Sequence, residues 1–313
     1  MVAEAAAAAA ETTASFLHIV ITLSILLFAA KIFAELFHRI KMPVVLGELL
    51  AGIVVGPFAL GSLPLFNGEP LVVLDETVRQ IGEISAIVIL FIAGLEITPR
   101  EFLRGGAASF TVGSLGVVVP FFVGYYVFTA FGLEALEAML VATALTATSI
   151  AITIQVLTEL GKMQTKEARL ILGAAIVDDI LAIAALSVVT TMVQTGNITP
   201  DIMDITFLIL KILGLFAVLL IGAVIVIPKI LHVERLWRSE GSIEGITTAA
   251  FFGVAGIAAF VGLSPIVGAF SVGMAVASTR VIKQVEEYVS KLGIIFSPLF
   301  FAIIRAQVEL RAG

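Results

Sequence analysis

Residues 173–183 read "GAAIVDDILAI" and place two adjacent aspartates, Asp178 and Asp179, inside an apolar segment. The run extends over 24 residues, from Leu170 to Val193, and no Lys or Arg lies within eight positions of either carboxylate. An ionised aspartate near the centre of a membrane helix costs about 2.5–3.5 kcal/mol. A proton, a cation, water or a polar partner must offset that cost, so the pair predicts an ion or proton site. A pair held only by structural hydrogen bonds is the alternative.

The composition places the whole chain in a membrane. Of 313 residues, 60% are hydrophobic and 13% charged, and the mean hydropathy is +1.14. A soluble domain cannot hide that much apolar surface, so we expect an all-α polytopic protein whose partner is the lipid bilayer. The sequence has no Cys, no phosphate loop, no nucleophile triad and no metal-ligand cluster. We therefore expect no enzyme activity, no bound cofactor and no nucleic-acid partner.

Apolar segments long enough to approach a membrane span recur along the chain. We predict about ten, at about 16–37, 43–60, 79–97, 107–131, 136–157, 168–194, 205–231, 243–262, 265–279 and 288–310. Residues 1–15 are Ala-rich and acidic and predict a frayed or disordered tail. Lys and Arg gather in alternate loops, whereas 61–77, 132–135, 195–204 and 263–264 have none. The positive-inside rule then places the N-terminus outside the cell.

Two stretches of the chain resemble each other. "PVVLGELLAGIVV", which begins at Pro43, and "PIVGAFSVGMAV", which begins at Pro265, each place two glycines five residues apart. The segments that follow them, "ILFIAGLEI" and "PLFFAIIRAQVEL", are also alike. The copies begin the second and the ninth of the predicted spans and so lie seven helices apart, which makes them cross the membrane in opposite senses. Inverted repeats of this kind are typical of secondary transporters.

The segment before the acidic pair, "TALTATSIAITIQ", carries hydroxyl side chains across the middle of a span. Hydroxyls bond to helix carbonyls or replace them where a helix opens, so we expect a discontinuous helix near 143–153. An ordinary helix with Thr at packing contacts is the alternative. Elsewhere, Lys31 and Glu35 are spaced for an intrahelical ion pair. Glu48 is either structural or lines an entrance, and Arg305 is either an interfacial anchor or a counter-charge for a carboxylate.

Six motifs that occur in order along the chain carry a family resemblance: "GELLAGIVVGP", "LFIAGLEI", "TALTATSIAIT", "GAAIVDDILAI", "SPIVGAFSVGMAVA" and "SPLFFAIIRAQVEL". Together they resemble the monovalent cation:proton antiporter-2 superfamily, of the NapA-like and Kef-like type. The resemblance implies an inverted-repeat fold of about thirteen helices. It also implies a homodimer in the plasma membrane, with a moving core of helices within about 79–194 and 288–310. Scaffold helices lie within about 16–60 and 205–279 of a transporter domain that spans 16–313.

The resemblance also implies roles for individual residues. Asp179 is expected to carry Na⁺ and protons, with Asp178 as its neighbour and second Na⁺ ligand. Thr148 and Ser149 are expected at the break of the discontinuous helix. Glu48 and Arg305 are accessory candidates from the residues themselves. Arg305 departs from the family, which usually has a small residue at that position, and it is a candidate cation near the carboxylates. The chain has fewer spans than the family, so we expect a C-terminally incomplete antiporter that lacks a Lys partner for Asp178.

The function expected from these features is exchange of Na⁺ for H⁺ by alternating access, in which the two ions compete for the Asp pair. Other readings stay open. They are a K⁺/H⁺ antiporter of Kef type, an ion- or pH-sensing membrane module without flux, and a solute symporter of similar build.

Overall fold

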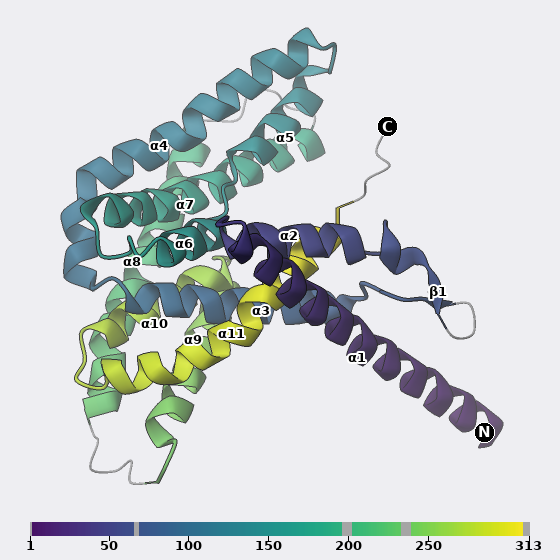
Figure 1. Cartoon of the computed structure of the whole chain (residues 1–313). Helices are drawn as coiled ribbons and strands as arrows, with labels where there is room; N and C mark the ends of the chain where they lie inside the picture. Colours follow the sequence, from purple (N-terminus) through teal and green to yellow (C-terminus); the bar gives the residue numbers. More distant parts are fainter. Residues whose placement is uncertain (1, 66–68, 196–201, 233–238, 309–313) are drawn as a thin grey trace. The chain divides into compact units, whose positions relative to one another are not determined.

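The computed structural model describes residues 2–65, 69–195, 202–232 and 239–308, and this part of the chain is nearly all helical (Figure 1). A two-residue strand pair, β1 (Pro64–Leu65) with β2 (Glu69–Pro70), is antiparallel. The helices are α1 (Val2–Arg39), α2 (Val44–Val55), the 3₁₀ turn η1 (Leu60–Ser62), α3 (Glu76–Leu95), α4 (Pro99–Ala130), α5 (Ala135–Thr146), α6 (Ile150–Glu159), α7 (Lys166–Thr195), α8 (Ile202–His232), α9 (Ser242–Phe260), α10 (Pro265–Ala277) and α11 (Ile282–Ala306).

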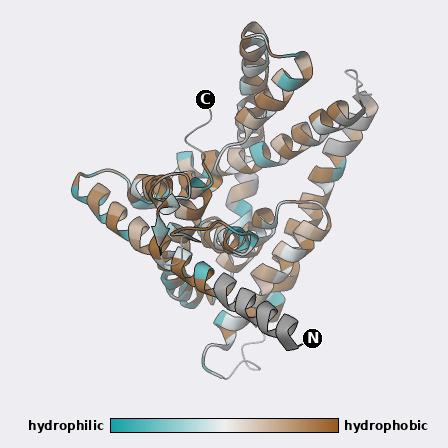
Figure 2. Ribbon diagram, turned by 90° about the vertical axis from the view of Figure 1, so that its right-hand side faces the viewer, coloured by the Kyte–Doolittle hydropathy of each residue, from teal (hydrophilic) through white to brown (hydrophobic). Residues whose placement is uncertain are grey.

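The prediction of an all-α polytopic membrane protein is confirmed. Within the described residues, nine segments are long and apolar enough to cross a membrane, and α10 is a shorter apolar helix. One of the nine, Ala135–Glu159, contains both α5 and α6. Figure 2 shows apolar colour over most of the length of the helices. These segments correspond to the predicted ten, with α1 already helical from Val2.

The helices pack as two compact units. One comprises residues 1–89 and 287–313, and the other comprises residues 90–286. The boundaries fall within α3 and α11. This division by packing is separate from the predicted moving core and scaffold, which stay a prediction.

In the first unit, α2 packs closely against two other helices through its two glycines. A side chain at Gly47 would lie 2.4 Å from the carbonyl oxygen of Phe33 in α1, and one at Gly52 would lie 2.3 Å from that of Ala302 in α11. Small residues let helix backbones approach in this way. The core around these contacts consists of buried apolar side chains from α1, α2, α3 and α11, among them Leu26, Ala30, Ala51, Val78 and Ile303.

The second unit repeats this arrangement at α10. A side chain at Gly268 would lie 2.6 Å from the carbonyl oxygen of Val254 in α9, and one at Gly273 would lie 2.3 Å from that of Phe91 in α3. In both copies the first glycine contacts the preceding helix. The second glycine contacts the third helix of the other copy. The internal resemblance in the sequence therefore corresponds to equivalent backbone contacts.

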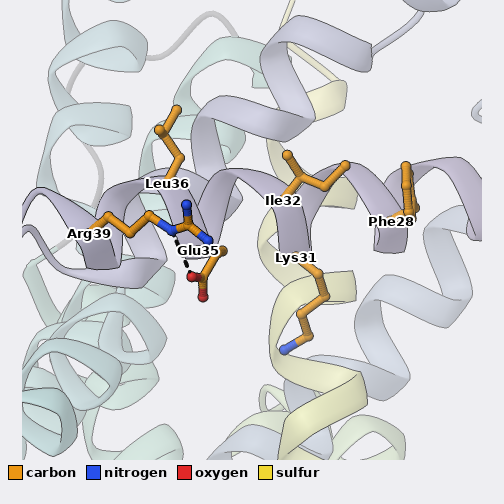
Figure 3. A pocket seen from close by; sticks show the side chains of 6 residues that line it. All are labelled: Phe28, Lys31, Ile32, Glu35, Leu36 and Arg39. Atoms are coloured by element: carbon orange, nitrogen blue, oxygen red, sulfur yellow. Dashed lines mark hydrogen bonds and ion pairs between the residues drawn. The ribbon is translucent and has the colours of Figure 1, made fainter.

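The ion pair predicted between Lys31 and Glu35 is wrong. Glu35 Oε1 instead accepts a hydrogen bond of 2.9 Å from Arg39 Nε, on the exposed face of α1. Figure 3 shows this pair with Lys31 extending away from it, along a shallow groove of about 420 Å³ that Phe28, Ile32 and Leu36 also line. Lys31 and Arg39 each lie four residues from Glu35 along α1, so the spacing allows an ion pair with either of them. Arginine lies in the last turn of α1, where its charge also faces the negative end of the helix.

Candidate functional site

The span before the acidic helix is broken at its middle. α5 ends at Thr146 and α6 begins at Ile150, and Ala147 and Ser149 between them have extended backbone. Ser149 is the N-cap of α6, and its Oγ accepts a hydrogen bond of 3.4 Å from the backbone N–H of Ile152. A serine is a favoured N-cap because its oxygen satisfies one of the free N–H groups at a helix start. The predicted discontinuous helix is therefore confirmed.

The threonines around the break have different partners. Thr143 Oγ1 donates to the carbonyl of Met139 at 2.8 Å, and Thr146 Oγ1 donates to the carbonyl of Thr143 at 2.8 Å. Thr153 Oγ1 donates to the carbonyl of Ser149 at 3.2 Å. These bonds are local and support the two half-helices at their ends. Thr148 differs, because its hydroxyl reaches another helix.

Thr148 connects the break to the acidic pair. Its Oγ1 donates a hydrogen bond of 2.5 Å to Oδ2 of Asp178, which lies in the unbroken helix α7. A bond this short is typical of a hydroxyl that donates to a carboxylate. Asp178 is only 4% exposed, and its other oxygen, Oδ1, has no hydrogen-bond partner within the described residues. One oxygen is thus held by Thr148, and the other is buried without a hydrogen-bond partner among the described residues.

Asp179 has a different environment. It is half-buried, and the described part of the chain gives it no hydrogen bond or ion pair. Adjacent residues diverge by roughly 100° around a helix, so the two carboxylates leave α7 in different directions. The structure thus holds one carboxylate in place and leaves its neighbour without a fixed partner.

A third helix, α4, closes one side of Asp178. A side chain at Gly113 would lie 2.4 Å from the carbonyl oxygen of Ala174, and one at Gly116 would lie 3.4 Å from Oδ1 of Asp178. One turn earlier, Ser109 Oγ donates to the carbonyl of Leu170 at 3.4 Å. α4 and α7 pack against each other. The sequence analysis did not predict that α4 packs beside Asp178, although small residues at i, i+4 and i+7 in "SFTVGSLG" were a signal for close helix packing.

The ends of the two half-helices contribute further charge at the break. The N-terminus of α6 carries a partial positive charge and the C-terminus of α5 a partial negative charge. Broken helices in transporters use such ends and their freed carbonyls to bind ions. Carboxylate, hydroxyl and carbonyl oxygens are thus available around the Thr148–Asp178 contact, as a hard cation prefers.

The two accessory candidates lie in the other unit. Glu48 is buried in α2, at 3% exposure. Arg305 is partly buried in the last turn of α11. The structure brings Thr148 and Asp178 into contact, places Asp179 next to them and uses Ser149 as a helix cap. Glu48 and Arg305 belong to the first compact unit, so they are described with that unit and not with this site.

The helix break contacts Asp178, one of two adjacent acidic residues in an apolar helix. These features are those of an all-α polytopic membrane protein built like a secondary transporter. The chain belongs to the sodium/hydrogen exchanger family, since the model of the transmembrane sodium/hydrogen exchanger matches residues 19–312. It is 32% identical to a high-affinity Na⁺/H⁺ antiporter, NhaS3, of Synechocystis, over 93% of this chain and 68% of the relative.

Two proteins of Bacillus cereus are similar to the same extent. The chain is 31% identical to the probable Na⁺/H⁺ antiporter GerT, over 92% of this chain and 74% of the relative. It is also 31% identical to the Na⁺/H⁺-K⁺ antiporter GerN, over 91% of this chain and 70% of the relative. These similarities confirm the resemblance found in the sequence motifs.

Proposed function

We propose that the protein exchanges Na⁺ for H⁺ across a membrane and that Asp178 and Asp179 carry the exchange. The observation that supports this most directly is the hydrogen bond from Thr148 in the helix break to Asp178. It joins the two features that a transporter site needs, which are freed backbone at membrane depth and an ionisable side chain. The names of NhaS3 and GerT are consistent with this substrate pair.

In this mechanism Na⁺ and protons compete for the same carboxylates. Removal from water disfavours an ionised carboxylate, so the pair either binds protons or is neutralised by a cation. Asp179 has no fixed partner within the described residues and carries the exchanged ion, while Thr148 holds Asp178 as its neighbour. Thr148 and Ser149 supply hydroxyl or backbone oxygens at the break. Two protons per Na⁺ make the cycle electrogenic.

Alternating access then exposes the loaded site to either side of the membrane. We propose that core helices within 79–194 and 288–310 move against a scaffold within 16–60 and 205–279, in a homodimer of the plasma membrane with the N-terminus outside. Glu48 and Arg305 are accessory positions in this scheme. Na⁺ and H⁺ are cargo, and the proposal needs no bound cofactor.

The test is Na⁺-driven proton movement in proteoliposomes. Asp179→Asn keeps the size of the side chain but cannot carry a charge, so exchange is expected to disappear while the protein remains folded. Thr143→Val is the matched control, because its hydroxyl bonds only to its own helix. Robust proton-coupled Na⁺ flux in Asp179→Asn would show that the assignment is wrong.

K⁺/H⁺ exchange is the second candidate, because GerN is named for K⁺ as well as Na⁺. The same assay with K⁺ in place of Na⁺ distinguishes the two. Proton release on addition of Na⁺, without flux in vesicles, would instead favour a sensing module.

A further inference from the structure

Two glycines on the same face of α4 have different surroundings. At Gly113 an added side chain would overlap the backbone of α7, at 2.4 Å from the carbonyl oxygen of Ala174 and 2.9 Å from Cβ of Val177. At Gly116 it would meet only Oδ1 of Asp178, at 3.4 Å, apart from its two chain neighbours and the nearby backbone of α4 itself. Gly113 therefore sets the distance between the helices. Gly116 leaves space that the packing does not require.

That space adjoins the oxygen of Asp178 whose bonding is incomplete. Oδ2 accepts the hydrogen bond from Thr148, whereas Oδ1 is buried and has no partner in the described part of the chain. A buried acceptor without a partner is costly, and more so when it carries charge. On the side of α4, the space next to Oδ1 is the position where Gly116 has no side chain.

We propose that Gly116 is a further residue of the cation site, at which the absence of a side chain allows the cation to bind. Because position 116 has no side chain, the monovalent cation, or a water that the cation carries, has room to bind the buried Oδ1 of Asp178. A methyl group at position 116 would stand in van der Waals contact with Oδ1 and cover it with apolar surface. This inference rests on the proposed function, because it assigns the space to the cation of the Asp pair.

The experiment compares Gly116→Ala and Gly116→Val with the parent protein. Na⁺ binding is measured as the Na⁺-dependent rise in the apparent melting temperature of the purified protein, and transport as the Na⁺ dependence of exchange in proteoliposomes. We expect Gly116→Ala to raise the half-saturating Na⁺ concentration on the order of tenfold, the loss of one bond to a charged group. Gly116→Val is expected to raise it further, with the melting temperature in the absence of Na⁺ little changed.

Gly222→Ala in α8 is the matched control, because apart from its chain neighbours and the nearby backbone of α8 no described atom lies within 4 Å of its added methyl group. A Gly116→Ala protein with the parent's Na⁺ dependence would overturn the inference. So would a fall in melting temperature without Na⁺, because the residue would then act through packing as Gly113 does. If Asp179→Asn abolishes exchange in the same assay, the proposed function stands in either case. If it does not, both proposals are wrong.

Discussion

The hydroxyl of Thr148 and the carboxylate of Asp178 are 30 residues apart in the chain and 2.5 Å apart in the structure. The donor belongs to a stretch without helical backbone, and the acceptor belongs to the interior of an unbroken helix. This contact selects one oxygen of Asp178. It leaves Oδ1 facing α4 and Asp179 without a fixed partner among the described residues.

Thr148→Val tests what this hydrogen bond contributes. Valine has nearly the same shape but cannot donate, so Asp178 would lose the hydroxyl that donates to Oδ2. A hydrogen bond to a charged group contributes about 1.5–3 kcal/mol. We expect the half-saturating Na⁺ concentration to change by on the order of tenfold or more. Thr143→Val, measured in the same proteoliposomes, is expected to stay near the parent, and equal effects of the two changes would contradict the role of Thr148.

Gly113→Ala tests the contact between α4 and α7. Alanine is the better helix former by about 0.8–1 kcal/mol. Its methyl group would, however, lie 2.4 Å from a backbone oxygen that cannot move independently. Overpacking of this kind costs about 1–3 kcal/mol, so the net effect is a lower apparent melting temperature in detergent. Gly222→Ala has the same gain in helix propensity without the overlap, and it should melt at or slightly above the parent.

Gly52→Ala and Gly273→Ala test the correspondence between the two copies of the internal repeat. Each added methyl group would lie 2.3 Å from a backbone oxygen, of Ala302 in the first case and of Phe91 in the second. Both variants are therefore expected to lower the apparent melting temperature by similar amounts. Gly256→Ala in α9 is the control, since its methyl group has no described neighbour within 4 Å. Loss of stability in only one of the pair would argue against equivalent contacts.

The proposed orientation can be tested by labelling, because the sequence contains no Cys. Single cysteines are introduced as Glu134→Cys, between α4 and α5, and as Gln164→Cys, between α6 and α7. With the N-terminus outside, an impermeant maleimide should label position 134 in intact cells and position 164 only after permeabilisation. The reverse pattern would invert the orientation.

Much of the fold was predictable because a membrane imposes a simple rule on sequence. A segment must be about 20 residues long and apolar to cross, and every backbone group must find a partner within the segment. The spans and the broken helix followed from that rule and from the hydroxyl-rich segment before Asp178. The partner of Glu35 was predicted wrongly because Lys31 and Arg39 have equal spacing from it. Spacing alone does not choose between them.

The sequence by itself determined that the chain is a bundle of membrane helices, that one span is interrupted and that two carboxylates lie inside an apolar segment. Local composition decides these features, because apolar length and hydroxyl or acidic side chains act within one segment. Only the tertiary structure decided that Thr148 holds Oδ2 of Asp178 and that α4 lies against Oδ1. It also decided that the backbone of α7 occupies the space beside Gly113, whereas no neighbouring backbone occupies the space beside Gly116. The physical reason is that contacts between helices depend on their rotation and separation, and many residues far apart in the chain set these together.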